Sequence, residues 1–125
     1  MARLSIRIDF ETPDGRIGPG MAELLSAIAD HGSIRRAAAA MGMSYRKAWL
    51  LVQAIQQTFG APAVTTATGG PEGGGTKLTE LGWTLLRCYR RIEAHAARAA
   101  KGDLRTLSAM IQKGRKSKSR TKPAK

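Results

Sequence analysis

The spacing of apolar residues between positions 33 and 60 predicts two helices joined by a sharp turn. The first helix is rich in alanine and begins after Ser33, whose hydroxyl can accept a hydrogen bond from a free amide of the first turn. Gly42 stands where the chain must turn, and glycine adopts the left-handed backbone of such turns at low cost. Ser44 caps the second helix. This segment therefore predicts a helix-turn-helix.

The second helix has one apolar stripe and one polar face. The stripe repeats at three- and four-residue steps, which is typical of a helix packed on a core, and consists of Ala48, Leu51, Val52, Ile55 and Phe59. A recognition helix reads base edges with its N-terminal residues, and its positive end favours phosphate. We therefore predict DNA contacts from Ser44, Tyr45, Arg46, Lys47 and Gln53, and from Ser33 and Arg35 at the start of the preceding helix.

Other interpretations of these residues stay open. A plain helical hairpin would use Ser44 only as a cap and would leave Arg46 and Lys47 to solvent. Helical spacing places Trp49 beside Tyr45 and off the apolar stripe, and we interpret it as a large core or interface residue in preference to a base contact.

A glycine-rich stretch between two β-prone segments follows the helix-turn-helix. The segments are residues 62–66 and 76–78, and two strands with such a tip at this place in the chain are typical of the wing of a winged helix. Wings lie along the phosphate backbone. The predicted wing contacts are Thr68, Gly69, Gly70, Gly73, Gly74, Gly75, Thr76 and Lys77. A phosphate-binding P-loop and a dinucleotide-binding loop do not fit, because neither has its strand-to-helix context here. A flexible linker without contacts is the alternative.

The N-terminal residues predict a strand, a turn and a helix. Apolar residues alternate with polar ones over 4–10, which indicates a strand with one buried face, and a turn follows over 12–15. Residues 17–20 should interrupt regular structure. We expect a helix over 21–31 with Met21, Leu24, Leu25 and Ile28 toward the core, ended by Gly32.

The last predicted helix is long, with Thr79 as its N-cap and residues 80–101 as its body. Its apolar stripe is close to a heptad repeat, and much of it has no obvious partner within the chain. We therefore predict homodimerisation through Leu85, Tyr89, Ile92 and Ala96. The alternative is that these turns fray into solvent. Asp103 is expected to cap a short helix over 104–112, and the tail beyond it to be disordered. The predicted division is 1–102 for the DNA-binding domain and 103–125 for the short helix and tail.

The basic composition favours a polyanionic partner, and the residue types present argue against catalysis. The 125 residues suit one core and carry a net charge of +12, of which seven cations lie in 113–125, where there is no acid. Such an excess favours nucleic acid first and an anionic membrane second. His31 and His95 have no cysteine or acidic partner at metal-binding spacing, and no nucleophile has a visible base. We expect neither an enzyme nor a cofactor or metal site.

The expected compartment is the cytoplasm, with association with the nucleoid. Cys88 is the single cysteine, so no disulfide frames the fold and a reducing compartment fits. The N-terminus does not resemble a signal peptide, and no apolar run approaches the roughly 20 residues that span a bilayer. We therefore expect no membrane partner.

Several of these segments together resemble the N-terminal DNA-binding domain of the ModE family of molybdate-responsive regulators, which is itself similar to the winged helix of LysR-type regulators. The resemblance covers about residues 4–100 and rests on the segments 32–34, 37–38, 42–49 (Gly-Met-Ser-Tyr-Arg-Lys-Ala-Trp), 67–70, 73–75 and 78–79, together with Gly82. It implies a mainly α fold with a small β wing, a winged helix-turn-helix with a long C-terminal dimerisation helix, and a palindromic operator. It also implies recognition-helix roles for Ser44, Tyr45, Arg46 and Lys47, and wing roles for the glycines at 69, 70 and 73–75.

One departure from the family concerns its effector. Complete members carry C-terminal molybdate-binding domains, whereas this sequence continues into a basic tail, so we expect no molybdate binding by this chain. Two functions remain in competition: a dimeric, sequence-specific transcriptional regulator that binds double-stranded DNA, and a non-specific architectural DNA-binding protein that depends on its tail. A role as a membrane-surface or adaptor protein would leave the wing unexplained.

Overall fold

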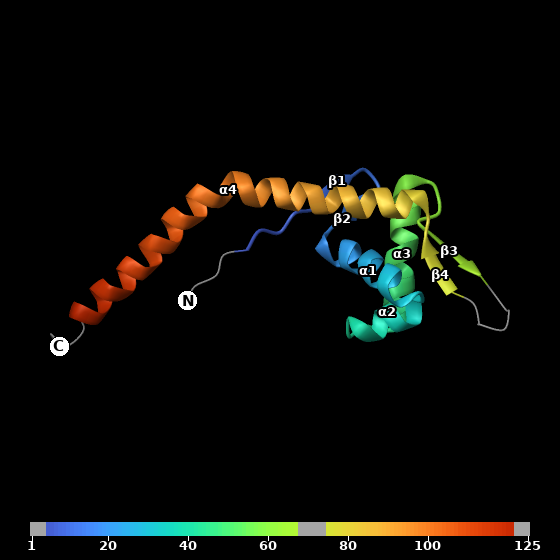
Figure 1. Cartoon of the computed structure of the whole chain (residues 1–125), viewed down its shortest axis with the longest axis horizontal. Coiled ribbons are helices and arrows are strands. Elements are labelled where there is room, and N and C mark those ends of the chain that lie inside the picture. The colour runs from blue at the N-terminus through green and yellow to red at the C-terminus, as the bar shows by residue number, and fades with distance from the viewer. Residues whose placement is uncertain (1–4, 68–74, 122–125) are drawn as a thin grey trace. The chain divides into compact units, whose positions relative to one another are not determined.

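The structure is a computed structural model that describes residues 5–67 and 75–121, with side chains as far as Arg115. It divides into two units, Arg7–Arg91 and a second one of Met1–Ile6 with Ile92–Lys125. The first unit contains the whole predicted helix-turn-helix and the strands that follow it (Figure 1).

A β-hairpin opens the first unit. Strand β1 (Phe10–Thr12) pairs antiparallel with β2 (Gly15–Ile17), so the predicted turn over 12–15 is confirmed. The predicted strand over 4–10 is wrong: of its described residues only Phe10 lies in a strand. The carbonyl of Ile8 accepts a hydrogen bond from the Tyr89 hydroxyl, so a side chain takes the place that a neighbouring strand would have had. The predicted break over 17–20 is also too wide, because Ile17 ends β2 and the next helix begins at Pro19.

Helix α1 (Pro19–His31) supplies much of the core. It begins two residues before the predicted start because proline, which lacks a donor, suits the first turn of a helix. Leu24, Leu25 and Ile28 are buried as predicted, whereas Met21 is half-buried. Gly32 ends the helix with φ at 72°, and its amide donates to the Ile28 carbonyl. The glycine stop is therefore confirmed.

Helices α2 (Ile34–Ala40) and α3 (Tyr45–Phe59) pack against α1 and against each other. Small residues lie in the contacts among these three helices, since Ala37, Ala38 and Ala48 are all buried. Val52 and Ile55 of the predicted stripe are buried too, and Leu51 is half-buried. Phe59 is exposed at the last turn, so the predicted stripe ends one turn early.

Strands β3 (Val64–Ala67) and β4 (Gly75–Leu78) form an antiparallel pair in which Val64 lies opposite Leu78. This pair joins α3 to α4 (Glu80–Thr121). The Thr79 hydroxyl accepts from the Gly82 amide, which confirms the predicted cap, and it donates to the Pro62 carbonyl. A Cβ on Gly82 would overlap the Ala63 carbonyl oxygen, so a glycine is required at this close approach.

Helix α4 differs from its prediction at the C-terminal end. It continues through Gly102 and Asp103 to Thr121, so Asp103 does not start a separate helix, and the prediction of disorder directly after Gln112 is wrong. The sequence has no proline between Glu80 and Thr121, so nothing of that kind interrupts the helix. Cations near a helix C-terminus also interact favourably with its dipole. No break in the helix marks the predicted domain boundary at residue 102.

Candidate nucleic-acid interface

The turn between α2 and α3 is held by two side-chain caps and one glycine. Ser33 accepts from the Arg36 amide at 2.9 Å and Ser44 accepts from the Lys47 amide at 3.0 Å. Gly42 has φ at 69° and provides the left-handed step of the turn. All three roles agree with the sequence prediction. Because both serine hydroxyls accept from the backbone, their established part is to fix where α2 and α3 begin.

The first turn of α3 exposes a cluster of cationic and aromatic side chains. Tyr45, Arg46 and Lys47 are all exposed, as predicted, and they stand at the positive end of a 15-residue helix. The Arg35 guanidinium of α2 lies 4.6 Å from the centre of the Tyr45 ring, a cation–π contact that sequence reasoning did not find. This contact ties the start of α2 to the start of α3, so the exposed cluster has a defined arrangement.

A groove of about 340 Å³ separates α3 from β3. The α3 residues on its wall follow helical spacing, and the full lining is Ile34, Tyr45, Trp49, Val52, Gln53, Gln56, Pro62, Val64 and Thr66. Trp49 is 43% exposed, so of its two predicted places, core or interface, the core is excluded. Its place beside Tyr45 and Gln53 agrees with the predicted helical spacing. Gln56, Pro62 and Thr66 were not foreseen, because only the folding of β3 alongside α3 brings them there.

The strands of the wing contribute fewer side chains than predicted. Lys77 is exposed on β4, but Thr76 is only 6% exposed and its amide donates to the Gly32 carbonyl. Thr76 therefore packs inward against the end of α1, and its predicted contact with DNA is corrected on that ground. Gly75 lies close to the same carbonyl. Thr68, Gly69, Gly70, Gly73 and Gly74 lie outside the described residues.

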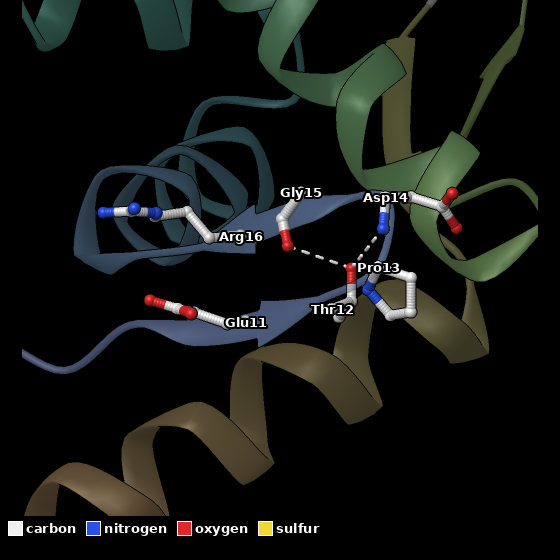
Figure 2. Close-up of a pocket in the computed structure, with 6 residues that line it drawn as sticks. All are labelled: Glu11, Thr12, Pro13, Asp14, Gly15 and Arg16. Carbon is white, nitrogen blue, oxygen red and sulfur yellow. Dashed lines mark hydrogen bonds between the residues drawn. The ribbon is translucent and has the colours of Figure 1, made fainter.

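The β1–β2 hairpin forms a second hollow, of about 500 Å³ (Figure 2). The Thr12 hydroxyl accepts from the Asp14 amide and donates to the Gly15 carbonyl, which fixes the turn. Glu11 and Arg16 lie opposite each other on the two strands, and their side chains point the same way in the figure. With Asp14 also on its rim, this hollow has one cation beside two acids. Its charge does not suit a phosphate backbone.

The four predicted dimer residues of α4 have different surroundings. Tyr89 is 3% exposed and belongs to the core of the first unit, so it has no surface to offer a second chain, and its predicted place in a dimer interface is corrected. Leu85 is half-buried against that core. In the second unit Ile92 is exposed and Ala96 is half-buried. The same unit exposes Leu107, Met110 and Ile111.

The described residues also bear on metal binding and on membrane insertion. No group of three or more histidine, cysteine or acidic side chains there is arranged to hold a metal ion. Among the helices described, none has the length and apolar character needed to cross a bilayer. Cys88 is a free, exposed thiol.

The capped helix pair, its exposed first turn and the antiparallel strands after it define a winged helix-turn-helix. Solved structures share this fold: the DNA-binding domain of CbnR in complex with DNA has a TM-score of 0.53 at 24% identity, covering 72% of this chain and 95% of that one. LysG from Corynebacterium glutamicum with bound effector Arg has a TM-score of 0.56 at 24% identity, covering 75% of this chain and 30% of that one.

The chain belongs to the lysR family of bacterial regulatory helix-turn-helix proteins, whose pattern matches residues 21–83. It is 44% identical over 89 residues to the molybdenum-pterin-binding protein MopB of Rhodobacter capsulatus, covering 71% of this chain and 33% of MopB. It is 43% identical over 70 residues to the molybdenum transport protein ModE of Herbaspirillum seropedicae, covering 56% of this chain and 26% of ModE. The chain thus spans about a third of the length of these relatives or less. The resemblance drawn from the sequence is confirmed, and the matched family is one of DNA-binding transcription regulators.

Proposed function

We propose that the chain is a sequence-specific regulator that binds a two-fold symmetric operator as a homodimer. The observation that carries this proposal is the capped first turn of α3, which exposes Tyr45, Arg46 and Lys47 at a positive helix end next to Arg35. Arg46 and Lys47 are the side chains suited to guanine or phosphate, because Arg and Lys donate to the guanine edge in the major groove. Lys77 of β4 supports a phosphate contact from the wing.

The part of α4 that lies in the second unit supports the homodimer. Its apolar residues recur at steps of three and four, which gives one stripe along the helix and comprises Ile92, Ala96, Ala100, Leu104, Leu107 and Ile111. Ile92, Leu107 and Ile111 are exposed in the single chain. A second copy would cover this stripe and place two recognition helices on two half-sites, roughly 34–36 Å apart in helix-turn-helix dimers. Ile92 and Ala96 belong to the proposed interface, with Leu85 at its N-terminal edge.

A non-specific architectural protein is the second candidate, and the seven cations of residues 113–125 favour it. Such binding depends on phosphate neutralisation and carries no sequence information. In both cases double-stranded DNA is the partner and the expected compartment is the cytoplasm, at the nucleoid. Molybdate binding has no part in either proposal.

Selection of bound sequences from a random duplex pool at near-physiological salt separates the two candidates. The full chain is compared with a variant in which the seven cations of 113–125 are replaced by glutamine, so that length is kept. A two-fold symmetric motif recovered with both proteins supports the dimeric regulator. No motif, together with loss of binding in the variant, would reject the regulator in favour of the architectural protein.

A dimer-specific variant completes the test. Replacing Ile92 and Leu107 by glutamate places charges in the proposed stripe, and sedimentation should then report a monomer. Glutamate at the exposed positions Arg98 and Arg105 is the matched control, because these residues lie off the stripe. A control that dissociates as fully as the stripe variant would count against the stripe as the interface.

A further inference from the structure

The groove between α3 and β3 has a mixed lining that suits a base pair. Trp49 and Val52 provide apolar walls on α3, and Val64 provides one on β3. Trp49 keeps 43% of its surface exposed, so its ring is available to a molecule that enters the groove. An exposed tryptophan of this kind is a large apolar surface whose burial a ligand can use.

Two glutamines lie in this groove, and they differ in their hydrogen bonding. The Gln56 side-chain oxygen accepts from the Ala63 amide at 3.0 Å, so Gln56 holds the segment before β3 against α3. The Gln53 side-chain amide makes no hydrogen bond to any residue that the structure describes, and Gln53 is half-buried. Gln53 therefore keeps both a donor and an acceptor for a partner outside the chain.

Trp49 and Gln53 share one face of α3 with the cationic first turn. They are separated by four residues, and Tyr45 precedes Trp49 by the same step, so the three side chains are neighbours on the helix. Tyr45, Arg46 and Trp49 also line a smaller hollow of about 230 Å³. Two cations stand next to the groove, because Arg46 lines the smaller hollow and the Arg35 guanidinium lies 4.6 Å from the Tyr45 ring. These cations favour a polyanion, and continuity with the proposed DNA-binding face makes DNA the occupant that we propose.

We propose that Trp49 and Gln53 read an A·T pair in the major groove. An adenine edge offers an acceptor at N7 and a donor at N6, which a glutamine amide matches in a bidentate pair. The paired thymine carries a 5-methyl group, which accepts apolar contact. Gln53 supplies the amide and Trp49 supplies the apolar surface. This inference rests on the proposed function, since it assigns a base preference within the operator.

The first experiment removes single methyl groups from DNA. In the operator recovered by selection, each thymine is replaced in turn by deoxyuridine, and affinity is measured by fluorescence anisotropy. The wild type should lose roughly fourfold at one thymine in each half-site, as expected for one buried methyl group. Trp49→Ala should bind more weakly and show no loss at that thymine. Trp83→Ala is the matched control, because Trp83 is 42% exposed on α4 and does not line the groove.

The second experiment removes adenine N7. With 7-deazaadenine opposite the same thymine, the wild type should lose roughly tenfold or more, because the bidentate pair is broken. Gln53→Ala should be insensitive to this change, whereas Trp49→Gln, a second variant at position 49, should remain sensitive to it. Circular dichroism verifies that each variant is folded, and the ratio between two DNAs with one protein does not depend on its active fraction.

The outcomes separate this inference from the proposal on which it rests. If selection yields no motif, the sequence-specific regulator is rejected and the base assignment is rejected with it. If a motif is recovered but Trp49→Ala and Trp49→Gln discriminate thymine from deoxyuridine as the wild type does, only the base assignment is overturned. A groove filled by a small molecule would give that second result.

Discussion

Two groups of cations in this chain lie on different parts of the fold. Around the turn between α2 and α3, Arg35, Arg46 and Lys47 stand on short helices whose starts are fixed by serine caps and whose undersides pack on alanines. Residues 113–125 contain seven cations and no acid. A side chain can read a base only if its backbone is held in place, whereas a run of cations needs only proximity to phosphate. The comparison therefore assigns specificity to the first group and affinity to the second.

The largest expected effect comes from the second group. Replacing the seven cations of 113–125 by glutamine should weaken binding on the order of 100-fold at physiological salt, equally on operator and random DNA. The dependence of log affinity on log salt should become shallower by about 0.9 for each phosphate that the variant no longer neutralises. Anisotropy titrations over a salt series measure both. A greater weakening on the operator than on random DNA would contradict the division of roles.

A larger side chain in the alanine contact between the helices should abolish sequence-specific DNA binding. It should leave intact the contribution of residues 113–125 to DNA affinity. Ala37 is fully buried between the helices, so Ala37→Leu should lower the free energy of unfolding by about 1–3 kcal/mol. Urea denaturation measures this destabilisation. Ala39 is exposed on the same helix, and Ala39→Leu is the control, with an expected change within about 0.5 kcal/mol.

Arg46→Ala tests base reading in the first group. We expect binding to weaken by about 1–3 kcal/mol on the operator and by less on random DNA, because a good bidentate base contact discriminates by that amount. Arg90→Ala, an exposed cation on α4, is the control. Equal weakening of Arg46→Ala on both DNAs would make Arg46 a phosphate contact.

The cap at Ser44 should have a smaller effect. Ser44→Ala removes the acceptor of the Lys47 amide and should lower the free energy of unfolding by about 1 kcal/mol. Thr106→Ala on α4 is the matched control. The Thr106 hydroxyl donates to the Gly102 carbonyl inside an existing helix, so no helix start depends on it.

The contact between Arg35 and Tyr45 should contribute least. Arg35→Ala removes an exposed cation–π pair worth about 0.5–1 kcal/mol, and thermal unfolding measures the resulting destabilisation. Arg36→Ala, at the neighbouring exposed position, is the comparison. Similar destabilisation by both would show that the aromatic contact adds nothing.

The helix-turn-helix could be predicted from the sequence because its signals are local. Each start depends on a serine three residues before the amide that it caps, and the left-handed step of the turn is at Gly42. The apolar stripe of α3 could be predicted for the same reason. Local chemistry of this kind does not require knowledge of distant partners.

Three of the errors have a common physical cause, which is contact between segments far apart in the chain. The alternation around Ile8 suggested a strand, yet its carbonyl binds Tyr89 from α4, and the same contact removes Tyr89 from the exposed stripe. Thr76 was predicted to donate to DNA from the surface, but its amide donates to the Gly32 carbonyl. Trp49 could not be assigned between core and interface, because nothing in the sequence shows that β3 leaves it a groove.

The junction beneath the wing has a consequence for protein engineering. The Thr79 amide donates to the Ala63 carbonyl, and the Thr79 hydroxyl donates to the Pro62 carbonyl. These hydrogen bonds join the residues before β3 to the residue after β4. They do not involve the segment that joins Ala67 to Gly75, and lengthening a flexible connection costs only about 0.6 kcal/mol for each doubling of its length. A peptide tag or a fluorescent reporter can be grafted there without disturbing the helices on either side.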